Sequence, residues 1–429
     1  MSHEQLGFVR TEMLPESAPP LASTGIVKWL RENLFSSPAN SLLTVVSVLV
    51  VYQIVSSAAP WFFNGVWDSP SLTACREILD GKTGGCFAVL SERWNQLLFG
   101  FKYPSELYWR PGLAFVLLFI AAAPLLFGKV FPRKMLIFTG LYPLIAFWLI
   151  WGGPVSTPVF ALLGVLFGAF VYTKMVKTSA GIAVIVSFVA ALVFWIVSGY
   201  LSGPFENIMA LEAIPSRDMG GFMINLMLGV ICVSLSIPLG ILLALGRQSS
   251  MPIIKWICVV FIEFIRGVPL ITLLFVANVV LAYFLPPGTN FDLILRVIIM
   301  ITMFSSAYIA EVIRGGLAAL PRGQYEAGDS LGLDYAQSMQ LIILPQALKI
   351  SIPGIVNVAV GLFKDTTLVS VISMFDIVGM IRGPILSSSE WNGVYWELFG
   401  FAVVLFFITC YGISQYSQWL ERQLQTDHR

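Results

Sequence analysis

Long apolar runs divide the chain into segments of the length needed to cross a lipid bilayer. A spanning helix needs about 20 mostly apolar residues. Runs of this kind are bounded by charges, prolines or glycines and lie near residues 42–60, 113–128, 135–152, 157–173, 181–200, 222–246, 253–285, 292–313, 340–372 and 396–418. The pattern predicts an all-α polytopic membrane protein with about ten transmembrane helices.

Two of these runs are interrupted by polar residues and prolines. The run 253–285 carries Arg266 and Pro269 near its middle, which favours a lateral helix that leads into a shorter span. The run 340–372 contains Pro345, Pro353 and Lys364 and is expected to be broken as well. Broken helices at membrane depth usually line a cavity or contact protein.

The composition excludes a soluble protein and several classes of site. Of the 429 residues, 57% are hydrophobic and 11% are charged, against roughly a quarter charged in soluble domains. The net charge of +1 and the lack of a long basic run argue against a nucleic-acid partner. The only histidines, His3 and His428, lie in the terminal tails. We therefore expect neither a catalytic residue nor a metal site.

Lysine and arginine gather in alternate connecting segments, including residues 129–134 and 174–177, and these are expected to be cytoplasmic. Both termini are then cytoplasmic: a tail over 1–41 that holds an interfacial helix, and a tail over 419–429. The segment 61–111 becomes an external loop. Its Cys75 and Cys86 could form a disulfide in an oxidising compartment, but two free thiols remain the alternative.

The segment 314–349 carries unusual helix punctuation. Pro321 suits the first turn of a helix over 322–331, which Gly332 would end. Asp334 and Gln337 have the spacing of a capping box that opens the next helix. A short rigid helix of this kind can dock a soluble partner, whereas the alternative is an ordinary hairpin between spans. Its length of about 36 residues favours docking, since helix–helix connections commonly have 2–8 residues.

In this segment the chain resembles the membrane subunits of type I ABC importers, specifically the polar amino-acid permeases. Their signature is E-A-A, three residues, G, nine residues and I-x-L-P. The matching residues are Glu326, Ala327, Gly328, Gly332, Ile342, Leu344 and Pro345. Every spacing agrees, and the one departure is Gly328 in place of the second alanine, which is expected to loosen the helix by about 1 kcal/mol.

The likeness extends over residues 222–418, through segments 266–270, 307–316, 323–324 and 364–372. It implies a permease domain over 220–418, with the last five spans as its core and the 322–332 helix as a cytoplasmic coupling helix. The first half, with an extension of about five spans over 42–210, resembles the long permease subunits of broad-specificity L-amino-acid importers of the Aap and Bzt type.

The resemblance implies partners that this chain lacks. A separate ABC ATPase subunit would use ATP, so no cofactor is expected in this chain. An extracytoplasmic amino-acid-binding protein would deliver the substrate, and a second homologous permease subunit would complete the pathway. The expected setting is a bacterial inner membrane, with polar L-amino acids such as Glu, Gln, Asp and Asn as substrates.

Charged residues within spans are costly and therefore candidate functional sites. Glu263 with Arg266, and Glu311 with Arg314, are spaced to pair on one helix face. Arg296, near the start of its span, is expected to be an interfacial anchor. Residues that could face the substrate path, with contact to the partner permease as the alternative, are Lys364, Asp365, Thr366 and Thr367.

An ion-gradient-driven secondary transporter is the alternative from another class. Against it, the first five spans show no evident repeat of the last five, and no isolated buried carboxylate stands out as an ion carrier. A membrane enzyme finds little support, because no nucleophile lies beside a base. The requirement for an ATPase separates the first two hypotheses.

Overall fold

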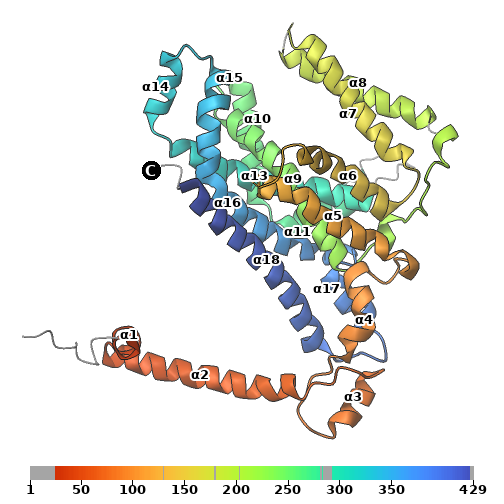
Figure 1. Ribbon diagram of the computed structural model, residues 1–429, viewed down its shortest axis with the longest axis vertical. Coiled ribbons are helices and arrows are strands. Elements are labelled where there is room, and N and C mark those ends of the chain that lie inside the picture. Colours follow the sequence, from red (N-terminus) through yellow and green to blue (C-terminus); the bar gives the residue numbers. More distant parts are fainter. Residues whose placement is uncertain are drawn as a thin grey trace, which may run out of the picture. The chain divides into compact units, whose positions relative to one another are not determined.

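The computed structural model describes residues 25–128, 130–177, 180–201, 203–280, 283 and 292–425 (Figure 1). Most of the tail 1–41 and the last four residues, with His3 and His428, lie outside this part. The chain divides into two compact units, one of residues 1–66 and 75–86, the other of residues 67–74 and 87–429. Among the described residues the structure is helical, apart from turns and three isolated β-bridges.

The first unit holds a helix that leads into a long apolar one. α1 (Gly25–Asn33) is short and amphipathic, as expected for an interfacial helix. α2 (Pro38–Phe63) begins with Ser37, whose side chain accepts a hydrogen bond from the Asn40 amide, and with Pro38 in its first turn. The Thr44 Oγ1 donates to the Leu34 carbonyl at 2.7 Å, which ties the start of α2 to the end of α1. α2 is long and apolar enough to span a membrane.

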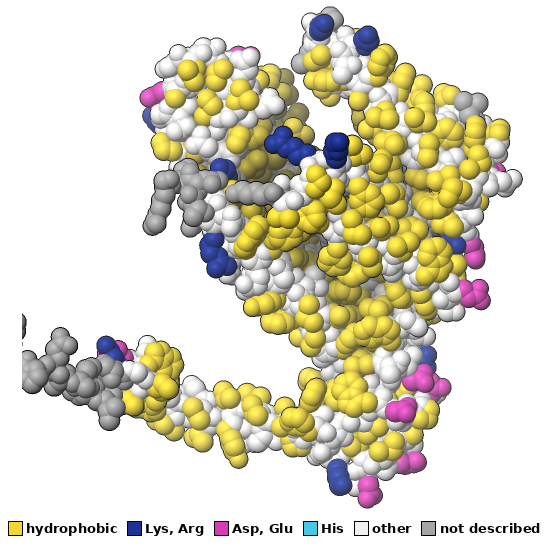
Figure 2. All heavy atoms as spheres, in the orientation of Figure 1, with side chains coloured by type: hydrophobic (Ala, Val, Ile, Leu, Met, Phe, Trp, Pro, Cys, Tyr) yellow, Lys and Arg dark blue, Asp and Glu magenta, His cyan; other side chains and the backbone are white. Residues whose placement is uncertain are grey.

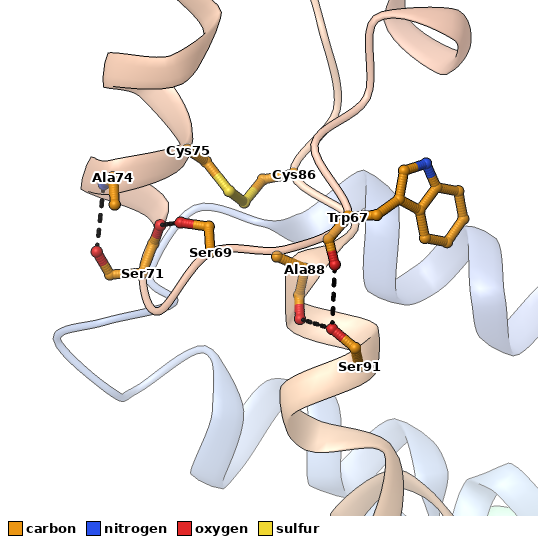
Figure 3. The surroundings of a disulfide bond; sticks show 8 residues. All are labelled: Trp67, Ser69, Ser71, Ala74, Cys75, Cys86, Ala88 and Ser91. Carbon is orange, nitrogen blue, oxygen red and sulfur yellow. Dashed lines mark hydrogen bonds between the residues drawn. A yellow bond between two sulfur atoms is a disulfide. The ribbon is translucent and has the colours of Figure 1, made fainter.

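The disulfide lies in the segment that follows α2. Cys75, on α3 (Leu72–Leu79), is joined to Cys86 in a disulfide (Figure 3). Val66 pairs with Cys86 in a β-bridge, and the Asn64 side-chain amide donates to the Thr83 carbonyl at 3.0 Å. Both sulfur atoms are buried within a small, hydrogen-bonded loop.

The second unit begins with the rest of the extension. Its elements are α4 (Ala88–Phe99), the 3₁₀ turn η2 (Ser105–Leu107), α5 (Trp109–Leu126), α6 (Met135–Trp151), α7 (Ser156–Met175) and α8 (Ala180–Leu201). The Tyr142 hydroxyl donates to the Ala114 carbonyl at 2.9 Å, which joins α6 to α5. Gly164 lies directly against the Trp195 ring, which brings α7 and α8 close together. Small residues permit such close approach of helices within a membrane.

The remaining elements follow the extension in the second unit. They are η4 (Ser216–Asp218), α9 (Phe222–Arg247), α10 (Pro252–Gly267), α11 (Leu270–Phe275), the π turn η5 (Val276–Val280), α13 (Leu293–Ala318), α14 (Arg322–Ser330), α15 (Tyr335–Ser338), η6 (Met339–Ile343), α16 (Leu344–Asp365), η7 (Thr366–Ile372), α17 (Ile377–Met380), η8 (Ile381–Ile385) and α18 (Tyr395–Gln425).

α9 and α13 run side by side in the same direction, and α16 runs against them. The starts of α9 and α13 share one hydrophobic cluster with Leu362, near the end of α16. Their ends share another cluster with Ala347, near the start of α16. Gly240 lies against Ile309 and Gly316 against Ser351, so glycines allow both contacts of α13.

The extension packs onto the same core. Tyr103, Ala114, Leu149 and Ile150 are buried in one cluster with side chains of α9 and α13. The Tyr103 hydroxyl donates to the Ile150 carbonyl at 3.3 Å. At the other end of α5, the Tyr416 hydroxyl on α18 donates to the Leu126 carbonyl at 2.7 Å. The part of the extension that includes α5 and α6 is therefore packed within the second unit.

The helices account for the ten predicted spans. Among the described residues, eight helices are long and apolar enough to cross a membrane, α10 and α11 form a pair bent by 102°, and α6 is a shorter apolar helix. The bend confirms that the run 253–285 is broken near Pro269, and the lateral orientation of α10 stays a prediction. In the view of Figure 2, hydrophobic side chains cover most of the visible surface, as expected of helices that contact lipid.

One of the two predicted breaks is not found. The run 340–372 is helical throughout, from Tyr335 to Ile372. Pro345 is the second residue of α16, just after the π turn η6, and Pro353 is accommodated inside α16. The residues assigned to the C-terminal tail, 419–429, continue α18 as far as Gln425. The Trp419 ring on α18 lies 5.5 Å from that of Phe127.

Candidate coupling segment and substrate path

α14 is held by local hydrogen bonds at both ends. Pro321 precedes it in an extended conformation, one residue before the predicted first turn. At its other end Gly332 has a φ of +69°. The Gly332 amide donates to the Asp329 carbonyl at 3.0 Å, and the Leu333 amide donates to the Gly328 carbonyl at 3.2 Å. This is the Schellman pattern, which requires a left-handed residue where Gly332 stands.

The next helix starts with the predicted capping box. The Gln337 amide donates to the Asp334 Oδ1 at 2.7 Å, and the Asp334 amide donates to the Gln337 Oε1 at 3.1 Å. These reciprocal bonds satisfy donors that a helix start leaves free. Two defined turns therefore fix α14 relative to α15, and the two helices lie together at one end of α16 (Figure 1).

One face of α14, its inner face, packs against α15, η6 and α16. Gly328 is buried, and a Cβ atom there would overlap the Ser338 Oγ. Tyr325, Ile342 and Leu344 pack around the hydrophobic cluster at the ends of α9 and α13. The Gln346 side-chain amide donates to the Gln324 Oε1 at 2.9 Å. The absence of a Cβ atom at Gly328 therefore has two effects. It lowers the helix propensity of α14, and it allows the close contact with Ser338.

The outer face of α14 is exposed. Its exposed residues include Arg322, Glu326 and Ala327. Beside them Leu331 and Tyr335 are exposed by 72% and 67%. Signature residues therefore divide in two: Gly328, Ile342 and Leu344 pack against the segment's own chain, and Glu326, Ala327 and Pro345 are exposed.

The segment between the two helical runs contains α14. α13 continues to Ala318 and the next helical run begins at Tyr335, so residues 319–334 lie between them. Residues 314–318 stay helical because Gly316 and Leu317 are buried against the core. The segment still exceeds an ordinary helix–helix connection.

Five charged side chains converge where α9, α10 and α13 meet. Glu311 accepts from three arginines, with N–O distances of 2.8 Å from Arg247, 3.5 Å from Arg266 and 3.1 Å from Arg314. Arg247 also contacts Glu263 at 2.9 Å. Glu311 is thus the centre of a cluster that links the three helices, and we call it the Glu311 cluster.

The pairing inside this cluster differs from the prediction for α10. Glu311 and Arg314 pair within α13, but Glu263 and Arg266 do not pair with each other. Each finds its partner on another helix, because the packing of α10 on α9 and α13 brings Arg247 and Glu311 within reach. Arg266 also lies over the Tyr308 ring, 5.6 Å from its centroid. Sequence spacing identified the four charges but missed Arg247.

The substrate-path candidates lie where α16 passes into η7, and their environments differ. Lys364 is exposed and makes no ion pair with a described residue. Asp365 is partly buried. Thr366 is fully buried and accepts a hydrogen bond from the Asn225 side-chain amide at 3.0 Å. The Thr367 hydroxyl donates to the Lys364 carbonyl at 2.9 Å. The four side chains do not form a single site in this conformation.

A buried carboxylate next to Thr366 was missed. Asp376 is fully buried, caps α17 through the Gly379 amide at 2.9 Å, and accepts from the Asn225 side-chain amide at 3.2 Å. Burial raises the pKa of Asp376 to about 6, although the hydrogen bonds and Arg382 oppose this. Asn225 at the start of an apolar helix was the only sequence signal for this network.

The sequence of the chain matches a known family of membrane transport proteins. Residues 236–420 match the family model described as the binding-protein-dependent transport system inner membrane component. A "Glutamate/glutamine/aspartate/asparagine transport system permease protein BztC" of Rhodobacter capsulatus is 53% identical over 438 residues, which cover 98% of this chain and 99% of that protein. The chain therefore belongs to the amino-acid permease family of ABC importers.

Two other relatives differ in how much of this chain they cover. The "Inner membrane amino-acid ABC transporter permease protein YhdY" of Escherichia coli is 36% identical over 96% of both chains. A "Probable glutamine ABC transporter permease protein GlnM" of Bacillus subtilis is 32% identical and covers 50% of this chain and 95% of its own. Relatives thus occur both with and without a counterpart to about half of the chain.

The family membership decides between the hypotheses drawn from the sequence. The chain is the permease subunit of an ATP-driven importer, and the ion-gradient-driven alternative is set aside. It is a multi-pass membrane protein and a transport subunit.

Proposed function

We propose that this permease imports polar L-amino acids, with Glu, Gln, Asp and Asn as the first substrates to test. The support is the identity of 53% along nearly the whole length of a relative named for these four amino acids. The bacterial inner membrane is the proposed location, with both termini in the cytoplasm. The permease domain is assigned to residues 220–418 and the extension to 42–210.

We further propose that the 322–332 segment transmits motion from a separate ABC ATPase. The observation that carries this role is the division of α14 into an exposed face with Glu326 and Ala327 and a packed face with Gly328. The Schellman turn at Gly332 and the capping box at Asp334 keep the segment rigid. A rigid connection passes a displacement of the outer face to α16, because α15 and α16 continue as one helical run.

The remaining partners follow from a binding-protein-dependent importer. A binding protein would deliver the amino acid on the outer side, and a second homologous permease subunit would complete the pathway. ATP would be used by the ATPase subunit, and no cofactor is proposed for this chain. On the substrate path, the strongest of the four candidates is Lys364, which is exposed and forms no ion pair with a described residue. The buried contact of Thr366 with Asn225 supports a structural role for Thr366.

The test compares uptake of labelled glutamate and glutamine in cells that express the complete importer. Glu326→Lys reverses the charge on the outer face of α14, and Glu77→Lys makes the same change on the exposed Glu77 of α3. With equal amounts of permease in the membrane, Glu326→Lys should abolish uptake of both amino acids and release the ATPase, and Glu77→Lys should do neither. Uptake that persists without bound ATPase would overturn the coupling role.

A further inference from the structure

A cavity of about 310 Å³ lies at the end of the core opposite α14. It opens where α9 and α13 begin and where η7 ends. Three basic side chains, Lys102, Arg217 and Arg296, line it together with Ser216, Asn278 and Ser373, and no acidic residue is among the described residues that line it. We call it the basic cavity.

The three basic residues come from distant parts of the chain. Lys102 follows α4 in the extension, Arg217 lies in η4 and Arg296 lies near the start of α13. One wall, at Phe375, is fixed by the Gly221 amide, which donates to the Phe375 carbonyl at 2.7 Å. The Phe101 ring lies edge-on to Phe375 at 5.2 Å and places its neighbour Lys102 at the cavity. The extension is therefore part of the wall.

The positive charge of the cavity is not balanced by the chain. None of its three basic residues forms an ion pair within the described part of the structure. The Asp292 Oδ1 accepts from the amides of Ile294 and Leu295 at the start of α13. Lys102 and Arg217 are exposed and Arg296 is partly buried. A cavity lined by charges of one sign concentrates ions of the opposite sign, so this cavity is suited to an anion.

Arg296, whose position near the start of its span predicts an interfacial anchor, is held by two backbone carbonyls. Its Nη1 donates to the carbonyls of Ala277 and Asn278, at 3.3 and 3.2 Å. Its Nε is buried and has no hydrogen-bond partner in the described structure. The two carbonyls hold the guanidinium in place, which leaves donors for a ligand. A guanidinium is well suited to a carboxylate, because it can donate two parallel hydrogen bonds.

We propose that the basic cavity receives amino acids that carry a side-chain carboxylate, on the outer side of the permease. This inference rests on the proposed import of polar amino acids and gives the extension a role in substrate selection through Lys102. Ligand sites commonly have volumes of about 300–1,000 Å³, so this cavity suits one small molecule. A net charge of −1 distinguishes glutamate and aspartate from their neutral amides, while Ser373 and Asn278 provide acceptors for the ammonium group.

The test uses the complete importer in proteoliposomes that contain ATP, with the same binding protein in every arm. Initial uptake of labelled glutamate and glutamine is measured for Lys102→Gln and Arg217→Gln. The conservative variants are Lys102→Arg and Arg217→Lys, and the matched control is Lys82→Gln in the exposed turn that follows α3. Each neutral variant removes one cation from the cavity and leaves the substrates and partners unchanged.

We expect both neutral variants to lower glutamate uptake by about tenfold, the effect of losing about 1.4 kcal/mol of attraction, and to change glutamine uptake by less than about twofold. The conservative variants and Lys82→Gln should keep glutamate uptake near wild type. Equal losses for both amino acids would overturn the inference in favour of a role in folding or binding-protein docking, and no change would also overturn it.

Two further outcomes separate the alternatives. If the loss of glutamate uptake disappears in vesicles made only of neutral lipid, the cavity holds an anionic lipid headgroup and the inference is wrong. If wild type transports neither amino acid, the proposed substrate class itself fails. Selective loss of glutamate uptake that persists in neutral lipid supports the inference.

Discussion

Gly328 on α14 lies in direct contact with Ser338 on α15, and a Cβ atom at position 328 would overlap the Ser338 Oγ and lie 3.2 Å from its Cβ. The departure from the second alanine of the family signature is thus matched by a close contact between the two helices. A residue with a side chain at 328 must displace α14 or move Ser338.

This contact predicts that Gly328→Val destabilises the coupling segment. Overpacking a well-packed contact typically costs about 1–3 kcal/mol. Gly323→Val is the matched control, since Gly323 lies on the same helix and has nothing within 4 Å of its Cβ position. Thermal unfolding of the purified importer should show a lower midpoint for Gly328→Val only. The double variant Gly328→Ala, Ser338→Ala removes the overlapping Oγ and should unfold close to wild type; equal midpoints for the two valine variants would contradict the packing argument.

Gly332 predicts a second, conformational effect. Its φ of +69° is costly for a residue with a Cβ atom, by about 1–2 kcal/mol. Gly332→Ala should therefore open the turn between α14 and α15, and limited proteolysis should cleave there faster than in wild type. Asparagine tolerates this conformation better, so Gly332→Asn should lie between the two. The same cleavage rate in all three proteins would show that the turn does not depend on glycine.

The Glu311 cluster predicts unequal effects for two glutamates. The Glu311 side chain is 15% exposed and contacts three arginines, whereas Glu263 is 54% exposed and contacts one. Glu311→Gln leaves three arginines close together without their shared counter-charge, and should lower the free energy of unfolding by about 2 kcal/mol. Glu263→Gln should cost less than about 1 kcal/mol, as for an exposed pair. Chemical unfolding of both variants measures the difference, and a larger loss for Glu263→Gln would refute the central position of Glu311.

The sequence predicted those features that depend on neighbours in the chain. The apolar runs marked the spans, and the spacing of Asp334 with Gln337 and the position of Gly332 predicted two turns that the structure contains. Such features need only a few adjacent residues. The same spacing argument failed for Glu263 with Arg266, because long side chains at a helix interface can choose a partner from another helix.

The features that were missed depend on residues far apart in the chain. Asn225 and Asp376 are separated by 151 positions and meet only when α9 packs beside α17. Lys102 lies in the loop after α4, Arg217 in η4 and Arg296 in α13, and in the sequence each looks like an ordinary basic residue of a loop or of the start of a span. No periodic pattern or local motif reports such a convergence, so the basic cavity emerges only from the folded chain.

Asp376 predicts a pH dependence of stability. Its pKa is raised from 3.8 to about 6 by burial, so the folded state retains this proton at pH values where the unfolded chain has lost it. The stabilisation is fully present below about pH 4, declines as the pH rises towards 6, and is absent above it. Asp376→Asn keeps an oxygen that can accept from the Gly379 amide and removes the titration. Relative to wild type, the variant should therefore gain about 2–3 kcal/mol of unfolding free energy between pH 4 and pH 7, the equivalent of about two pKa units. Unfolding of both proteins across this range, with Asp68→Asn at an exposed carboxylate as the control, gives the comparison. A difference between variant and wild type that stays constant with pH would show that Asp376 does not titrate in the folded protein over this range.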